Sequence, residues 1–155
     1  MPTTRTKLLN ATKALCADFA AQKDVDVLLS HFSTTHQLTA LEHGLSSLAP
    51  FLGRRFVGHD GIKEYFETIS KHLTYTDMSF SEWVIDAEAR KVSVKGEAKS
   101  TWLSTQESWE ETFVYVLDFD EEEKVTDYQV WADTGAAYLA RKGKLSQLDE
   151  EMDKH

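Results

Sequence analysis

The sequence predicts an α+β fold in which helices pack on one face of an antiparallel sheet. The 155 residues suit one domain with one core, because 41 % of them are hydrophobic and only 7 are Gly and 2 are Pro. Apolar residues recur with the helical period of 3.6 up to Leu73 and with the strand period of 2 after it. Helices followed by a run of strands are typical of α+β layers.

Three helices are expected before residue 74. Within each helix the apolar residues fall on one face, and in the second, Val25, Leu28, Leu29 and Phe32 follow the i, i+3, i+4, i+7 spacing. Between the second and third helices, residues 35–42 are expected to be extended, and residues 44–58, with two Gly and one Pro, to form a long loop. The expected helix starts, chosen mostly for side chains that can cap a first turn, are Thr6, Asp24, and His59 or Asp60.

Four strands and a closing helix are expected in the second half. The clearest strand is 91–102, in which small and apolar residues alternate with charged and polar ones. Such alternation indicates a sheet with one solvated face and one covered face. The remaining expected strands are 80–85, 109–119 and 125–133, and the closing helix is 136–141.

The predicted domain covers residues 5–141, and residues 142–155 are expected to form an acidic, mobile tail. A net charge of −9 argues against a nucleic-acid partner. The absence of any apolar run near ~18 residues argues against a membrane partner. The single Cys16 fits a reducing, cytoplasmic location. Residues 1–17 are basic and contain no acidic residue, so they are either the first helix of the fold or a mitochondrial presequence.

The covered face of strand 91–102 predicts a cavity. Gly96, Ala98 and Ser100 take up little volume, whereas Trp102 and Trp109 near the strand ends are large. A curved sheet with small residues at its centre can leave a hollow between itself and the helices. The alternative is that the helices fill this space.

Two strings resemble the SnoaL-like polyketide cyclase group of the nuclear-transport-factor-two-like superfamily. They are FVGHDGI at residues 56–62 and KVTDYQVWAD at residues 124–133, and the resemblance covers about residues 5–141. It implies a cone, in which a strongly curved antiparallel sheet wraps around three helices and leaves a pocket at the wide end. Members often form homodimers through the outer sheet face. Their activities include cyclisation, isomerisation, dehydration and epoxide hydrolysis, and many have no known catalysis, so the fold does not fix the function.

Four residues, at three places in the chain, are candidates for acid–base chemistry. The resemblance implies that Asp133 is a general acid/base; alternatively it is the N-cap of the next helix. Glu111 has the parity of the apolar residues of its strand, so it either lines the pocket with a raised pKa or lies at a wet rim. Glu42 and His43 end the first strand, close to where steroid isomerases carry their base. His43 has a suitable pKa, but it could also be a surface residue.

Aromatic and amide side chains are candidates for holding a small apolar or aromatic ligand. Each could equally be an ordinary core or dimer contact. The candidate ligand-binding residues are Tyr65, Trp102, Trp109, Gln129 and Trp131.

Other chemistries find little support. The histidines at 31, 36 and 43 are not spaced as metal ligands, and we expect no metal. No phosphate loop or nucleophile elbow occurs, so we expect no cofactor. The limonene-epoxide hydrolase pattern has an aspartate where this chain has Val130.

The sequence therefore predicts a pocket protein that transfers a proton on a small, mostly apolar carbonyl compound. Asp133 would act as acid/base with Glu111 or His43 as its partner, and Tyr65 or Gln129 would stabilise the enolate. The rival hypothesis is a non-catalytic homodimer that binds a ligand or a protein. In the rival, the strand face that bears Tyr128, Val130 and Ala132 would lie between the subunits.

Overall fold

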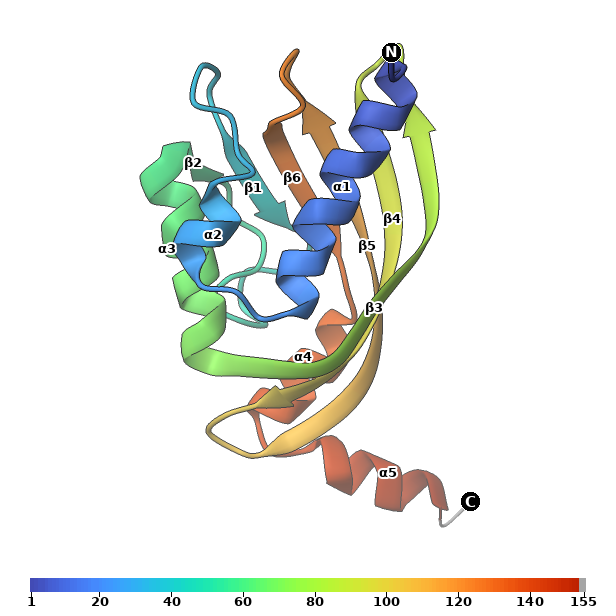
Figure 1. The fold of residues 1–155 in the computed structure, drawn as a ribbon. Coiled ribbons are helices and arrows are strands. Elements are labelled where there is room, and N and C mark those ends of the chain that lie inside the picture. Colours follow the sequence, from blue (N-terminus) through green and yellow to red (C-terminus); the bar gives the residue numbers. More distant parts are fainter. Residues whose placement is uncertain (154–155) are drawn as a thin grey trace.

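A curved six-stranded sheet forms the body of the computed structural model, which describes residues 1–153, apart from the side chains of residues 149 and 153 (Figure 1). The strand order is β2-β1-β6-β5-β4-β3. All neighbours are antiparallel except β1 and β6, which run parallel. The predicted α+β fold is confirmed, with one parallel pair where only antiparallel pairs were expected. The strands are β1 Thr39–Glu42, β2 Phe56–Val57, β3 Leu73–Asp86, β4 Lys91–Trp102, β5 Glu107–Phe119 and β6 Val125–Trp131.

Three helices lie on the inner side of the curved sheet, and two follow β6 at one end (Figure 1). The cap of α1 is Thr3, whose hydroxyl accepts from the N–H of Thr6, so the helix begins earlier than expected. Asp24 caps α2 as predicted, by accepting from the N–H of Val27. The helices are α1 Thr4–Ala20, α2 Val25–Leu29, α3 Gly58–His72, α4 Thr134–Arg141 and α5 Leu145–Asp153.

Two bulges bend β3, which is longer than the expected strand 80–85. Its register against β4 shifts twice, and Asp77 and Glu82 in the shifted segments have positive φ angles of 56° and 57°. Bulges of this kind increase the local twist of a strand. As a result β3 curves beneath the inner helices (Figure 1), so that Tyr75 and Met78 face the interior and the exposed Thr74 lies at its edge.

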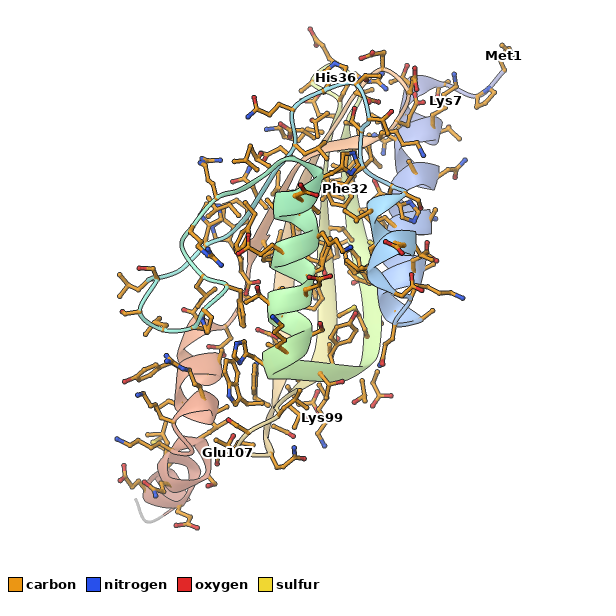
Figure 2. The ribbon with its side chains drawn as sticks, turned by 90° about the vertical axis from the view of Figure 1, so that its left-hand side faces the viewer. Met1, Lys7, Phe32, His36, Lys99 and Glu107 are labelled. Atoms are coloured by element: carbon orange, nitrogen blue, oxygen red, sulfur yellow. The ribbon has the colours of Figure 1, made fainter. Side chains whose placement is uncertain are left out.

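An aromatic cluster fixes the inner helices to the sheet. The ring of Phe19 in α1 lies 5.4 Å from that of Tyr115 in β5, and the ring of Phe66 in α3 lies 5.8 Å from that of Tyr128 in β6. Phe32 joins the same cluster, 6.1 Å from Phe66 (Figure 2). Buried rings at these separations contribute contact energy in addition to the area that they bury.

The chain ends differ from the sequence-based picture. Residues expected to form a mobile tail include α5, whose first N–H groups at Leu145 and Ser146 donate to the carboxylate of Glu107, each over 2.9 Å. At the other end, most of residues 1–17 belongs to α1, and Leu8 and Leu15 are fully buried. None of the described helices is long and apolar enough to cross a membrane.

Candidate functional site

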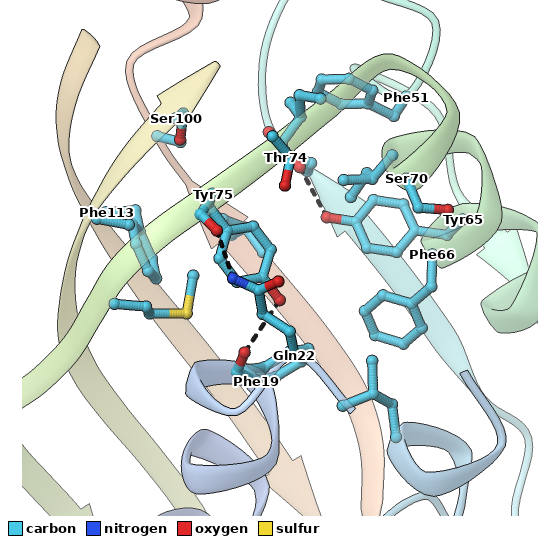
Figure 3. Close-up of a pocket in the computed structure, with 18 of the residues that line it drawn as sticks. Phe19, Gln22, Phe51, Tyr65, Phe66, Ser70, Thr74, Tyr75, Ser100 and Phe113 are labelled. Carbon is cyan, nitrogen blue, oxygen red and sulfur yellow. Dashed lines mark hydrogen bonds between the residues drawn. The ribbon is translucent and has the colours of Figure 1, made fainter. Parts of the chain in front are cut away.

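A cavity of about 760 Å³ lies between the inner helices and the sheet (Figure 3). Figure 3 shows Tyr65 and Phe66 reaching into it from α3, with Tyr75 and Phe113 of the sheet on the other side. Cavities of this size accept ligands of several rings. Its aromatic wall comprises Phe19, Phe51, Phe66, Phe113, Tyr115 and Tyr128.

The small residues of β4 shape this cavity in two ways. Ala98 and Ser100 line it directly. Gly96 does not, because the ring of Phe113 lies across it; a Cβ atom at residue 96 would come within 2.2 Å of that ring. The glycine therefore lets Phe113 lie against the sheet and form part of the wall.

The predicted tryptophans do not line the cavity. Trp102 is buried and stacks on His72, with ring centroids 5.5 Å apart, so it belongs to the core. Trp109 is also buried, outside the residues that line the cavity. Of the five candidate ligand-binding residues, Tyr65 alone lies at the cavity.

The carboxyl of Glu42 is held inside the cavity by β1. In the parallel pairing, Glu42 lies beside Val130 of β6, whose side chain also faces the interior. The N–H of Gly53 donates to the Glu42 carbonyl over 2.9 Å, which fixes the backbone. Only 9 % of Glu42 is exposed. The hydroxyl of Tyr65 donates to its Oε1 over 2.7 Å.

Burial changes the acidity of Glu42. The loss of water raises its pKa from the ordinary 4.5 to about 7, the hydrogen bond from Tyr65 lowers it, and the negative charge of Glu111 raises it. A carboxyl that titrates near pH 7 is present in both protonation states under physiological conditions. Such a group can both give and take a proton.

Glu111 supplies a second carboxyl to the same cavity. Its Oε1 accepts from the backbone N–H of Asp133 over 3.1 Å, and its Oε2 accepts from the hydroxyl of Ser100 over 3.0 Å. Burial is the main cause of the raised pKa of Glu111, these hydrogen bonds offset part of the rise, and the negative charge of Asp133 adds to it. Glu111 thus has two donors that favour its ionised form, and Glu42 has one.

Asp133 is placed differently from the prediction. Its side chain is exposed, does not line the cavity, and accepts from the N–H of Ala136 over 3.0 Å as the N-cap of α4. The expectation that Asp133 lies in a dry pocket is wrong, because β6 ends at Trp131 and the chain has turned into α4 by residue 133. The capping alternative is the one that the structure shows.

His43, Gln129 and Trp131 come together on the opposite face of the sheet. The His43 Nε2 atom lies 2.9 Å from the Gln129 Oε1 atom, and the His43 ring stacks on Trp131 at 4.1 Å and 9°. Side chains alternate along a strand, so these three residues face away from Glu42 and Val130. The expectation that they line the cavity is therefore wrong.

The face of β6 that the rival hypothesis placed between subunits is internal. Tyr128, Val130 and Ala132 line the cavity of the single chain. Sequence reasoning weighed Glu42 only beside His43 and placed Tyr128 at an interface. The signal that identifies both as inward-facing is the β1–β6 register, which pairs Ala40 with Tyr128 and Glu42 with Val130.

The histidines noted in the sequence lie apart. His31 pairs with Asp18 at 2.6 Å, His36 lies near Glu121 at 3.5 Å, and His43 is on the outer sheet face. Within residues 1–153, no three potential ligands gather in a way that could hold a metal ion.

Comparison with known proteins identifies the fold. No protein-family model matches the sequence, and no curated protein is significantly similar to it. Among solved structures, an NTF2-like protein of unknown function from Burkholderia pseudomallei has a TM-score of 0.74 and 15 % identity, covering 86 % of this chain and 96 % of its own. A Bacillus subtilis structure with a provisional isomerase name has a TM-score of 0.73 and 12 % identity, covering 92 % and 97 %. The BvnE pinacolase of Penicillium brevicompactum has a TM-score of 0.67 and 15 % identity, covering 96 % of both chains.

These neighbours confirm the NTF2-like fold that the two sequence strings predicted. They show that proteins with isomerase and pinacolase names share this architecture. At these identities the likeness concerns the fold, and the chemistry has to be argued from the cavity itself.

Proposed function

We propose that the protein is a cofactor-free acid–base catalyst that isomerises a small, mostly apolar carbonyl compound inside the cavity. The observation that carries the proposal is the pair of carboxyls, Glu42 and Glu111, in one largely apolar cavity, with Glu42 titrating near pH 7. Buried carboxyls with different surroundings are the usual means of running acid and base steps together. The isomerase and pinacolase names among the fold neighbours are consistent with this chemistry.

The hydrogen bonds assign the two roles. Glu111 accepts from two donors that favour its ionised form, so it is the base that removes a proton from the carbon next to the carbonyl. Protonated Glu42 gives its proton to the carbonyl oxygen, and the hydroxyl of Tyr65 stabilises the carboxylate that remains.

The enol then collapses to the isomer. For a β,γ-unsaturated ketone this enol is a dienol, so Glu111 returns its proton to the γ-carbon, the double bond moves into conjugation with the carbonyl, and Glu42 takes back the proton from the enol oxygen. Both carboxyls end in their starting states, so the cycle balances without a cofactor. The backbone N–H of Asp133 holds Glu111 in place, but its exposed side chain, which caps α4, transfers no proton in this cycle.

Proton transfer can be tested before the natural substrate is known. Deuterium uptake at the carbons next to the carbonyls of androstanedione would be followed by mass spectrometry in D₂O. We expect Glu42→Gln and Glu111→Gln to slow enzyme-dependent exchange by about 100-fold or more. Glu110→Gln is the matched control, because Glu110 adjoins Glu111 in the chain and is exposed. Exchange that survives both cavity substitutions would refute the proposal.

The pH profile gives an independent check. Exchange requires Glu111 ionised and Glu42 protonated, so its rate should form a bell whose basic limb falls near pH 7. In Glu42→Gln this basic limb should disappear.

The outer sheet face favours a second property, homodimer formation. Trp131 is 43 % exposed there, and Val114 on β5, in register with it, is also exposed. Exposed apolar side chains grouped on a sheet are typical of interaction surfaces. Light scattering of the wild type and of Trp131→Glu would test this: we expect a dimer and a monomer, and a wild-type monomer would contradict it.

A further inference from the structure

The charges that line the cavity are strongly unequal. Among its described lining residues there is a single cation, Lys23, against four acids, Asp24, Glu42, Glu67 and Glu111. Lys23, Asp24 and Glu67 are exposed, which places them at the rim. The interior therefore contains two carboxyls and no positive side chain.

The hydrogen-bond donors of the interior are already used by the protein. The hydroxyl protons of Tyr65 and Ser100 go to Glu42 and Glu111. The hydroxyl of Tyr75 donates to the carbonyl of Phe19 over 3.1 Å, as the dashed line in Figure 3 shows. Each of these hydroxyls has only one proton to donate. The hydroxyls of Tyr115 and Tyr128 also line the cavity and are directed to Tyr128 and Tyr65, respectively. Beside the two carboxyls the cavity consequently presents acceptor oxygens to a ligand, and the proton of Glu42 is the donor that remains there.

This imbalance selects among ligands. A carboxylate or phosphate would place a third negative charge beside two carboxyls without a cation, and both the repulsion and the loss of water oppose it. A ligand with acceptors alone would remove water from ionised Glu111 without replacing that hydrogen bond, which also weakens binding.

We propose that the substrate of this site is a neutral polycyclic hydroxy ketone with its hydroxyl next to its carbonyl, so that the carbonyl accepts the proton of Glu42 and the hydroxyl donates to ionised Glu111. The inference rests on the proposed function in one respect, because it takes Glu42 as protonated and Glu111 as ionised. It goes further by requiring a donor on the substrate and by excluding anionic substrates, among them acyl phosphates, nucleotides and free carboxylic acids.

Three steroids on one skeleton form a matched set of probes. The compound 16α-hydroxyandrostan-17-one carries a ketone and a neighbouring hydroxyl, androstane-16,17-dione carries two neighbouring ketones, and androstane-17β-carboxylic acid carries a carboxylate at the same end. Binding to the full-length protein would be measured by calorimetry at about pH 6, below the pKa of Glu42 of about 7. We expect the hydroxy ketone to bind about 10-fold more tightly than the dione, and the carboxylate at least about 100-fold more weakly than the hydroxy ketone.

Substitution of the acceptor gives the decisive comparison. Glu111→Gln removes the interior negative charge but keeps an oxygen for the N–H of Asp133. It should bring the hydroxy ketone and the dione to within about 3-fold of each other and improve carboxylate binding by about 10-fold or more. Glu110→Gln, the exposed neighbour, should leave the wild-type ranking unchanged.

The possible outcomes are distinct. Equal binding of the three probes, preference for the carboxylate, or no binding of any of them would overturn the inference. The ranking is measured without turnover. Selective binding without deuterium exchange would therefore contradict the proposed catalysis but not the substrate class. Deuterium exchange without this selectivity would contradict the substrate class but not the proposed catalysis.

Discussion

Replacing Glu42 with Gln should change how the stability of the protein depends on pH. The folded protein raises the pKa of Glu42 from 4.5, its ordinary value, to about 7. Between these two values the folded state keeps a proton that the unfolded state releases. Stability therefore falls as pH rises through this window, and it becomes constant above the folded pKa.

The size of the effect follows from the shift. One pKa unit corresponds to about 1.36 kcal/mol, so a shift from 4.5 to about 7 removes about 3 kcal/mol of stability between pH 4 and pH 8. Glutamine cannot ionise, and its amide oxygen can still accept from the hydroxyl of Tyr65. Glu42→Gln should thus equal the wild type near pH 4 and exceed it by about 3 kcal/mol at pH 8, or about 6 to 12 °C in melting temperature.

Urea denaturation of both proteins at a series of pH values measures this difference. Glu111 is present in both proteins, so the difference between the two stability curves reports Glu42 together with its interaction with Glu111. Glu110→Gln controls for the loss of one acidic residue at the surface. If the stability curves of the wild type and Glu42→Gln run parallel from pH 4 to pH 8, the carboxyl does not lie in an apolar interior, and the reasoning about the site fails with it.

Three further substitutions probe the elements around this carboxyl. Tyr65→Phe removes the donor to ionised Glu42, so the pKa of Glu42 should rise further and stability at pH 8 should fall by about 1.5 to 3 kcal/mol, measured by the same urea titrations. Asp133→Ala should destabilise the fold by about 1 kcal/mol in urea denaturation through loss of the α4 cap, with deuterium exchange on androstanedione unchanged; a large loss of exchange would contradict the surface role. Gly96→Ala should destabilise by about 1 to 3 kcal/mol and weaken probe binding in calorimetry, because its Cβ would displace the Phe113 ring from the cavity wall. Unchanged stability would show that Phe113 can move at little cost.

Most of the fold could be predicted from the sequence, because the spacing of apolar residues within a segment indicates whether that segment is a helix or a strand. The alternation along 91–102 gave the bounds of β4 correctly, and Asp24 identified the start of α2. Two features depend on contacts that no local pattern contains. The bulges that extend β3 require its pairing with β4, and α5 begins where two N–H groups meet the carboxylate of the distant Glu107.

The site was predicted less well, for a related reason. Glu111 was placed correctly on the apolar face of its strand because buried residues at 109, 113, 115 and 117 alternate with more exposed ones on both sides of it. Asp133 satisfied the family-like string equally well, yet the string does not specify where β6 ends. The strand stops at Trp131, two residues short of the expected end, so the carboxylate caps a helix in solvent.

The choice between Glu42 and His43 shows how register decides a site. Within β1 alone, Leu41 is more apolar than Ala40, and alternation therefore favours Leu41 and His43 as the inward pair. The structure has the opposite parity because β1 pairs in parallel with β6, where Tyr128 and Val130 already face the cavity. Paired residues of neighbouring strands share a face, so Ala40 and Glu42 must also point inward. A strand of four residues has too few apolar side chains to decide which of its faces points inward, so its longer neighbour β6 decides it. The carboxyl of Glu42 therefore points into the apolar interior, and His43 points outward and stacks on Trp131.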